Sequence, residues 1–285
     1  MSERILMTDE SLLALYDRAL RREIGYRHTR RDVVNGVVRH VAEPPRLNFV
    51  LYSELDEESA DAAIEEQIAF FRELGQPFEW KVYDHDRPGD LRDRLLAHGL
   101  VADEPDTIMV LDLQAAPESL LAPVEADVRR LAGPEQLDDV VSVLRGVYDV
   151  PFDWVYPQLG GDMARPDYLS IYVAYADERP VSAAWTYFYP DSPFAGLWGG
   201  STLPDYRRRG LYSALLATRV QEAIARDKRY LIIDASHMSR PIVARHGFRL
   251  LTIAHGCQWR PTLDADYDAA PAMSTERPAD GQPGY

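Results

Sequence analysis

The sequence of 285 residues predicts an α/β protein, more closely α+β, with two tandem domains that each hold a mixed, mostly antiparallel sheet flanked by helices. Three observations favour this fold class. Strand-like and helix-like patterns alternate along the chain. A segment with two prolines and little periodicity, residues 114–123, lies between two halves. Both halves end in the same order, namely a helix, a His-Gly pair, an apolar residue and a strand, at residues 91–113 and 239–259.

The first half, residues 1–113, predicts one domain that begins with a helix. Thr8 is a candidate N-cap for that helix, and acidic residues fill its first turn. Four segments rich in β-branched and aromatic residues predict strands, at residues 33–41, 47–52, 78–84 and 107–113. A second helix is predicted over 56–74, where apolar residues recur at helical spacing on one face: Ile64, Ile68, Phe71 and Leu74.

After the predicted linker, residues 124–262 predict a second domain. A proline at the first helical position favours a helix over 134–148, and residues 149–166 form a loop or a broken helix. A further helix is expected from the loop after residue 206 to about Arg226, and a short one over 239–247. The alternating segments predict strands at 127–132, 168–176, 181–189, 196–203, 230–235 and 248–259. Residues 263–285 carry little apolar pattern and predict a disordered tail.

Composition restricts the function classes. The chain has a net charge of -15, which argues against broad nucleic-acid binding, because that binding depends on many lysines and arginines. No window has the length of apolar sequence that a membrane helix needs, and the first residues lack the apolar run of a signal peptide. We therefore expect a cytoplasmic protein that binds neither nucleic acid nor membrane. The single cysteine, Cys257, lies in a predicted strand and is expected to be a buried thiol.

One short stretch, LPDYRRRGLYSALL at residues 203–216, opposes this overall charge. Three arginines and Gly210 directly precede an amphipathic helix, and between residues 205 and 229 seven basic residues face three acidic ones. The start of a helix presents unpaired N–H groups and a partial positive charge, so it attracts anions. Glycine lets the backbone approach a ligand closely. The stretch therefore predicts an anion site and not merely a solvated run of charge.

This stretch resembles the phosphate-binding signature of the GNAT superfamily of acyl-CoA-dependent N-acyltransferases, Gln/Arg-x-x-Gly-x-Gly/Ala, which begins here at Arg207. The resemblance covers residues 124–260 in the family's order of elements. It implies acetyl-CoA as co-substrate and no metal. By position, the strand residues Gly200, Ser201, Thr202 and Leu203 would hold the pantetheine arm. The pyrophosphate would be bound by Arg207, Arg208, Arg209, Gly210, Leu211, Tyr212 and Ser213. Tyr212 departs from the small residue of the signature.

The resemblance also implies an acid and a base for acetyl transfer to an amine. The family's closing element places Ser236 where an asparagine is usual and Val243 where a tyrosine protonates the departing thiolate. Ser236 is therefore the candidate substitute acid, and the alternative, which the position before a helix favours, is a helix cap. Asp153 is the proposed base, because residues 148–162 combine acidic and aromatic side chains suited to an organic cation. The alternative is a surface loop with solvated aspartates.

The first half resembles a degenerate copy of the same domain without a cofactor site. Its strand-to-helix junction carries Asp56, Glu57, Glu58 and Asp61, which cap a helix well but repel phosphate. The sequence thus predicts a tandem GNAT protein whose second copy acetylates a primary amine of a small molecule or peptide. A non-catalytic acyl-CoA sensor remains open because of Val243, and a DNA-binding role for the arginines is the third reading. The histidines at 237, 246 and 255 match no ligand spacing, so no metal site is expected.

Overall fold

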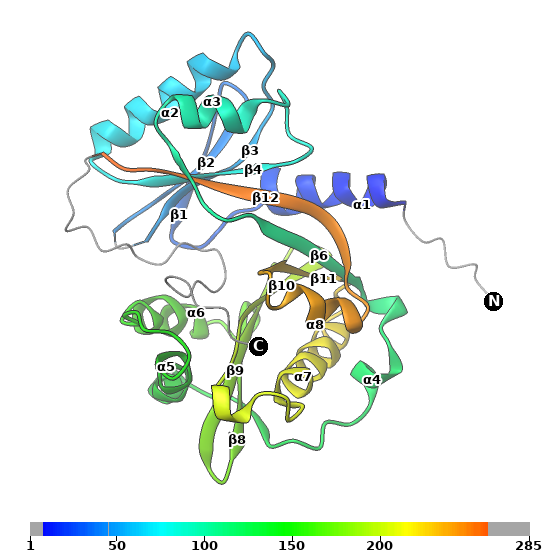
Figure 1. Cartoon of the computed structure of the whole chain (residues 1–285). Helices are drawn as coiled ribbons and strands as arrows, with labels where there is room; N and C mark the ends of the chain where they lie inside the picture. The colour runs from blue at the N-terminus through cyan, green and yellow to red at the C-terminus, as the bar shows by residue number, and fades with distance from the viewer. Residues whose placement is uncertain (1–7, 45, 262–285) are drawn as a thin grey trace. The chain divides into compact units, whose positions relative to one another are not determined.

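The computed structural model describes residues 8–44 and 46–261, and it confirms the predicted fold class of mixed sheets with flanking helices (Figure 1). The predicted tail, 263–285, lies outside the described residues. The chain forms two compact units, and we call them the N-terminal unit, residues 8–108 with 250–261, and the C-terminal unit, residues 109–249. The division falls within β6 (Asp106–Asp112) and just after the first residue of β12 (Arg249–Trp259). The domain limits predicted from the sequence, 1–113 and 124–262, stay a prediction.

The N-terminal unit begins with a helix that changes character in its middle. Thr8 caps α1 (Asp9–Tyr16) by accepting a hydrogen bond from the N–H of Ser11 at 3.2 Å, as predicted. The predicted single helix then continues as a π-helical stretch, Asp17–Arg22, whose wider turn buries the Arg21 side chain.

The sheet of this unit runs in the order β1-β2-β3-β4-β12. Its strands are β1 (Thr29–Val34), β2 (Val37–Ala42), β3 (Asn48–Ser53), β4 (Phe78–Tyr83) and β12, with the short β5 (Val101–Ala102) beside β12. The predicted strand 33–41 is a hairpin, because Asn35 and Gly36 both adopt positive φ at 48° and 81° and turn the chain. The parallel pair β3–β4 follows from the helical crossover between them.

Two helices cover one face of this sheet, α2 (Ala60–Leu74) and α3 (Leu91–Ala97) (Figure 1). The predicted apolar face of α2 packs with Phe78 and Trp80 of β4 in the core, apart from Leu74, which is exposed at the last helical residue before Gly75 ends the helix. Cys257 of β12 is fully buried in the same core, as predicted.

The C-terminal unit repeats this strand pattern. Its order is β6-β11-β10-β9-β8-β7. The pairs β7–β8, β8–β9 and β9–β10 are antiparallel, and β10–β11 is parallel. The strands are β7 (Val128–Arg130), β8 (Leu169–Ala176), β9 (Arg179–Phe188), β10 (Phe194–Thr202) and β11 (Tyr230–Ala235). The helices are α4 (Glu118–Leu121), α5 (Leu137–Arg145), α6 (Gly161–Met163), α7 (Leu211–Ala225) and α8 (Arg240–Arg245). The predicted loop 149–166 contains a π-helical turn at Tyr156–Gly160 that leads into α6.

Helices lie on both faces of this sheet (Figure 1). The buried face of α7 packs on β10 and β11 through Leu216 and Val220. On the other face lie α5 and α6, so the alternation along β9 places Trp185 and Tyr187 toward α6 and its preceding loop while Phe188 faces α7. The candidate functional site lies where β10 and β11 separate, next to both faces of this sheet.

Candidate functional site

The parallel strands β10 and β11 separate before their ends. They pair from Phe194 with Tyr230 to Leu197 with Ile233, whereas β10 itself continues to Thr202. Beyond Leu197, β10 pairs with β9 through a bulge between Trp198 and Ser201, with Gly199 at φ 65°. A bulge bends a strand and interrupts its ladder, so the backbone of residues 198–200 borders a gap in the sheet.

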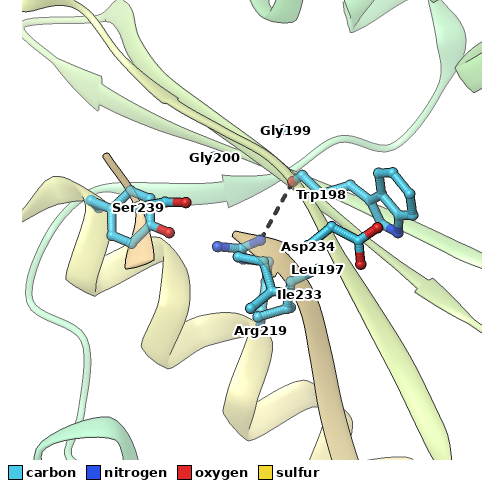
Figure 2. Close-up of a pocket in the computed structure, with 9 residues that line it drawn as sticks. Leu197, Trp198, Gly199, Gly200, Arg219, Ile233, Asp234 and Ser239 are labelled. Atoms are coloured by element: carbon cyan, nitrogen blue, oxygen red, sulfur yellow. Dashed lines mark hydrogen bonds between the residues drawn. The ribbon is translucent and has the colours of Figure 1, made fainter. Parts of the chain in front are cut away.

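A small cavity occupies this gap (Figure 2). Its volume is about 10 Å³. Backbone and side chains of β10, α7, β11 and the turn before α8 line it: Leu197, Trp198, Gly199, Gly200, Tyr212, Arg219, Ile233, Asp234 and Ser239. Such a space holds about one water molecule, so the cavity is closed to larger ligands in this arrangement of side chains.

Arg219 is buried in the wall of this cavity. Its Nε donates to the carbonyl of Leu215 at 3.1 Å, and its Nη1 reaches the carbonyls of Trp185 and Trp198 at 3.4 and 3.5 Å (Figure 2). Trp185 and Trp198 are register partners on β9 and β10 where the bulge begins, so the guanidinium supports the backbone at that point. Arg219 is not among the residues predicted for the site. The feature of the sequence that could have indicated its burial is its place four residues after Leu215, on the apolar face of α7.

The start of α7 lies at the end of the same strand. After the turn Pro204–Tyr206, Arg208 and Gly210 adopt positive φ at 61° and 79°. The N-cap residue of α7 is Gly210, which has no side chain to cap the first N–H groups. Alternating positive and negative φ aims successive backbone N–H groups into one concavity, which suits an anion. A Cβ on Gly210 would meet no heavy atom within 4 Å, so the space beside it is open.

The predicted arginines all lie exposed around this concavity. Nε of Arg207 donates to the carbonyl of Thr202 at 3.2 Å, which joins the loop to β10. The Arg209 guanidinium stacks over the Tyr206 ring at 4.8 Å. Arg208 extends the positive field without a contact of this kind. Ser213 in the first turn of α7 shares a hydrogen bond with His246 Nε2 at 3.0 Å, and burial lowers the pKa of that imidazole.

The strand residues predicted to hold a pantetheine arm have differing surroundings. Gly200 borders the cavity, whereas the Ser201 hydroxyl donates to Tyr148 and the Thr202 hydroxyl shares a hydrogen bond with Ser182 at 2.7 Å. Leu203 packs close to Gly146, where a Cβ would come within 2.3 Å of it. These three side chains hold β10 in place, so any contact that they offer a ligand comes from their backbone.

The predicted catalytic side chains lie apart from each other. The Ser236 hydroxyl accepts a hydrogen bond from the N–H of Ser239 at 3.3 Å within the turn before α8, whose N-cap residue is Ser239. Ser239, and not Ser236, lines the cavity. Val243 is fully buried in the core. Asp153 is exposed on its loop, with no contact that draws it to the cavity.

Asp162 is the buried carboxylate of this region. Its Oδ2 accepts a hydrogen bond from the Tyr187 hydroxyl at 3.1 Å. Burial and the charge of Asp162 raise the pKa of Tyr187 well above its usual value, so the phenol stays protonated. The Tyr187 ring lies edge-on to Tyr168 at 5.2 Å and to Trp198 of the cavity wall at 6.4 Å. An aromatic patch with one buried acid thus adjoins the gap in the sheet.

Other aromatic residues of the predicted acceptor loop have structural partners. Tyr156 donates to Asp138 at 2.7 Å, Tyr148 packs on Phe152, and Trp154 lies edge-on to Trp185 at 6.3 Å. Among the residues that the structure describes, no group of three or more His, Cys, Asp or Glu could hold a metal ion. Within the same residues, none of the helices is both long and apolar enough to cross a bilayer.

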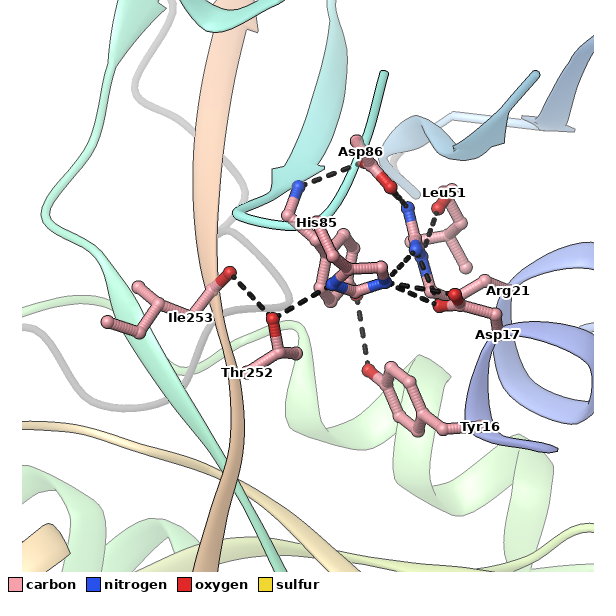
Figure 3. Close-up of polar contacts among 9 residues, drawn as sticks. Tyr16, Asp17, Arg21, Leu51, His85, Asp86, Thr252 and Ile253 are labelled. Atoms are coloured by element: carbon pink, nitrogen blue, oxygen red, sulfur yellow. Dashed lines mark hydrogen bonds and ion pairs between the residues drawn. The ribbon is translucent and has the colours of Figure 1, made fainter. Parts of the chain in front are cut away.

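The N-terminal unit has a corresponding gap between β3 and β4, which pair in parallel from Asn48 with Phe78 to Val50 with Trp80. Arg21 fills it (Figure 3). Its Nε donates to the carbonyl of Leu51 at 2.9 Å, its Nη2 to both oxygens of Asp86 at 2.7 Å, and its guanidinium stacks on Tyr83 at 3.7 Å.

The same cluster contains an acid, a histidine and a threonine in a row. Asp17 accepts from Arg21 at 2.6 Å and contacts His85 Nε2 at 2.9 Å, and His85 Nδ1 lies 3.0 Å from the Thr252 hydroxyl (Figure 3). Burial raises the pKa of Asp17, but the hydrogen bond to His85 and the charge of Arg21 outweigh it, so the net pKa is lowered.

The start of α2 also differs from that of α7. The Asp56 carboxylate accepts hydrogen bonds from the N–H groups of Glu58 and Ser59 at 3.2 and 2.9 Å and from the Ser59 hydroxyl at 2.6 Å. An aspartate of the chain itself therefore occupies the amides that a phosphate would need.

Comparison with known proteins agrees with this geometry. Residues 137–248 match the model of the acetyltransferase (GNAT) family. The structure resembles a GCN5-related N-acetyltransferase from Kribbella flavida, with a TM-score of 0.64 and 16% identity over 88% of this chain and 96% of that one. It also resembles a conserved protein of unknown function from Staphylococcus epidermidis ATCC 12228, with a TM-score of 0.62 and 13% identity over 84% and 98%.

A tandem GNAT protein from the clavulanic acid biosynthesis pathway is a third similar structure, with a TM-score of 0.57 and 12% identity over 84% of this chain and 85% of that one. At these identities the structural likeness shows the fold. The sequence matches no curated protein. Residues 137–248 are thus similar to the GNAT acetyltransferase family, and the similar structures include a tandem GNAT protein.

Proposed function

We propose that the C-terminal unit transfers an acetyl group from acetyl-CoA to a primary amine of a small molecule or peptide. The observation that carries the proposal is the junction of β10 and α7. There, a gap between two parallel strands leads directly to a helix start whose N–H groups and three arginines face open space. Both parts lie within the residues that match the family model.

The positive concavity at the start of α7 would bind the pyrophosphate of acetyl-CoA. Backbone N–H groups of residues 208–213 supply hydrogen bonds without side-chain entropy, and Arg207 to Arg209 supply charge. The gap beside residues 198–200 would take the pantetheine arm, because backbone groups of β10 border it beyond the last pair with β11. The arm then leads the thioester toward the bulge that Arg219 supports.

The aromatic patch on the other face would hold the amine. A protonated amine is attracted to the faces of aromatic rings and to a carboxylate, and Tyr187, Trp198 and Asp162 offer both beside the gap. Asp162 is the better candidate for binding this cation, because it is buried whereas Asp153 is exposed. Asp153 remains the proposed base, as an accessible carboxylate that can pass a proton to solvent.

The reaction needs little further chemistry from the protein. The bound ammonium group first gives one proton to the base, which passes it to solvent. The neutral amine nitrogen then attacks the thioester carbonyl carbon, a C–N bond forms, and the C–S bond breaks with its electron pair on sulfur. The nitrogen loses its second proton to the base, and the thiolate takes a proton from solvent. A thiolate is a good leaving group, so the replacement of the family's tyrosine by Val243 does not exclude turnover.

The alternative function is an acyl-CoA sensor without turnover. Val243 favours it, because this buried aliphatic side chain brings no proton to the cavity. The proposal for the N-terminal unit is common to both functions: it binds no acyl-CoA and has a structural role.

Two measurements separate these possibilities. Calorimetry of the full chain with acetyl-CoA tests binding, and release of free thiol in the presence of a panel of amines tests transfer. Replacing Arg207, Arg208 and Arg209 by alanine should abolish binding. A matched control replaces three exposed arginines of the N-terminal unit, Arg18, Arg22 and Arg30, and changes the net charge equally. Equal binding by both triple variants would contradict the site, and tight binding without thiol release would favour the sensor.

A further inference from the structure

Tyr212 stands where the pantetheine arm would pass. It lies in the first turn of α7, and its ring lies against Gly200 of β10. A Cβ on Gly200 would come within 2.9 Å of Tyr212 Cε2 and within 3.6 Å of its hydroxyl oxygen. The ring therefore occupies the room that the missing side chain of Gly200 leaves beside the strand.

This ring explains why the cavity is so small. The gap between β10 and β11 opens beyond Leu197 and Ile233, but the space left in it measures only about 10 Å³, enough for one water molecule. A chain of methylene and amide groups alongside Gly200 would overlap the phenol. Two other bulky side chains line the cavity. Trp198 belongs to the β10 wall itself, and Arg219 is fixed in the wall by its hydrogen bonds to the carbonyls of Leu215 and Trp198.

We propose that Tyr212 closes the channel for the acyl-CoA arm, and that binding requires its ring to rotate away from Gly200. The inference rests on the proposed function, because it identifies the residue that controls entry to the same site. The closed state is the one observed, with the ring packed against the apolar core beneath α7.

Rotation is sterically feasible at this position. In the body of a helix the side-chain rotamer near +60° clashes with the preceding turn, but a residue of the first turn has no preceding turn. Tyr212 is only half-buried, and the space beside Gly210 at the helix start is open. The ring can thus leave the gap toward solvent without moving β10 or α7.

If acetyl-CoA binds only when the Tyr212 ring has left the gap, the apparent affinity equals the affinity of the open form multiplied by the fraction of molecules that are open. If about one molecule in ten is open, then Tyr212→Ala should bind acetyl-CoA about ten-fold more tightly, mainly through faster association. Tyr212→Phe keeps the ring and should stay closer to the parent protein than to the alanine variant. Stopped-flow fluorescence and calorimetry with acetyl-CoA as the probe measure both quantities.

The matched control is Tyr206→Ala, which removes a tyrosine from the same loop that does not line the cavity. It should not accelerate association. Circular dichroism confirms that each variant is folded.

The outcomes separate this inference from the proposed function. Faster and tighter binding by Tyr212→Ala alone supports it. If the parent protein binds acetyl-CoA and Tyr212→Ala binds it no more tightly, the inference is overturned and the proposed function is left intact. Binding by the alanine variant and not by the parent supports a permanently closed channel, and it overturns acetyl transfer by the natural chain. If neither binds, both ideas fail.

Discussion

The two units share a strand pattern, but they differ at two places in it: the gap between the parallel strands and the start of the helix that follows. In the C-terminal unit, the gap between the parallel strands is lined by glycines, and the helix that follows starts with uncapped N–H groups and three arginines. In the N-terminal unit, Arg21 fills the gap and Asp56 occupies the helix start. The N-terminal unit thus satisfies from its own chain the backbone groups that, under the proposed function, a ligand would satisfy in the C-terminal unit.

The strand pattern shared by the two units leaves backbone groups without partners at the same place in each unit. Separated parallel strands followed by a helix provide backbone groups that need partners. Whether a ligand supplies these partners depends on a few side chains and not on the sheet.

The largest test of the comparison is the stoichiometry of binding. We expect one acetyl-CoA per chain, because the Asp56 carboxylate and Arg21 exclude a second. Calorimetry with the full chain measures the number directly. A value of two would show that the N-terminal unit binds as well, and that its filled gap opens.

Removing the arginine that fills the N-terminal gap should cost the most stability. Arg21→Met leaves the buried carboxylate of Asp86 without its partner, and we expect a loss of about 3 to 5 kcal/mol in the free energy of unfolding. Urea denaturation at neutral pH measures it. The neighbouring Arg22→Met, whose side chain is 56% exposed, is the control and should change little. If Arg21→Met binds two acetyl-CoA molecules per chain and the parent protein binds one, the Arg21 side chain is what excludes the second.

Gly210→Val should remove most of the acetyl-CoA affinity, on the order of a hundred-fold. Gly210 adopts φ 79° in open space, so valine meets no clash with the protein but strongly disfavours this backbone conformation. The loop would then rotate its N–H groups away from the concavity. Gly75→Val is the matched control, because Gly75 also has positive φ, at 65°, and open surroundings at a helix end of the N-terminal unit. It should lower stability and leave binding unchanged; the same loss of binding in both variants would mean that strain acts through the fold.

Arg208→Ala should weaken acetyl-CoA binding by a smaller amount, about 1.5 to 3 kcal/mol at most, because it deletes one charge-assisted contact and leaves the N–H groups in place. The remaining affinity should depend less on salt than that of the parent protein. Calorimetry at two ionic strengths tests this. An unchanged salt dependence would show that Arg208 does not face the phosphates.

The smallest effect concerns the acid side of the stability profile. The pKa of Asp17 is lowered in the folded protein, so its interactions stabilise the fold above the ordinary aspartate value near 3.8. This contribution is lost as the pH falls through the lower, folded pKa. Asp17→Asn should therefore show a shallower loss of stability between about pH 5 and pH 2 in urea titrations. Parallel curves for the variant and the parent would contradict the assignment.

The sequence predicted the fold class and drew attention to the loop at residues 207–213, because both depend on local patterns. Strand alternation, the glycine in the signature and the run of arginines are visible without knowing which segments meet. The cap at Thr8 and the buried Cys257 were predictable for the same reason.

Contacts between distant segments were not predictable. Arg21 meets Asp86 across 65 residues, and Asp162 meets Tyr187 across 25, so nothing in the local pattern selects these acids over the exposed Asp153. Ser236 remains a candidate by resemblance alone, since the pattern did not show that Ser239 would line the cavity. The signature marked Tyr212 only as a departure from a small residue, and the local pattern did not show that its side chain turns onto Gly200.

The burial of Cys257 makes the chemistry of this protein convenient to observe. Its thiol is inaccessible in the core, and burial raises its pKa to about 11, so it stays protonated and unreactive at neutral pH. Reagents that detect free thiol can therefore test the proposed release of coenzyme A from acetyl-CoA with little background from the protein. For the same reason, a cysteine introduced on the surface near Arg208 would be the one reactive position for a fluorescent label. Opening of the channel at Tyr212 could then be followed directly in a single, otherwise unaltered chain.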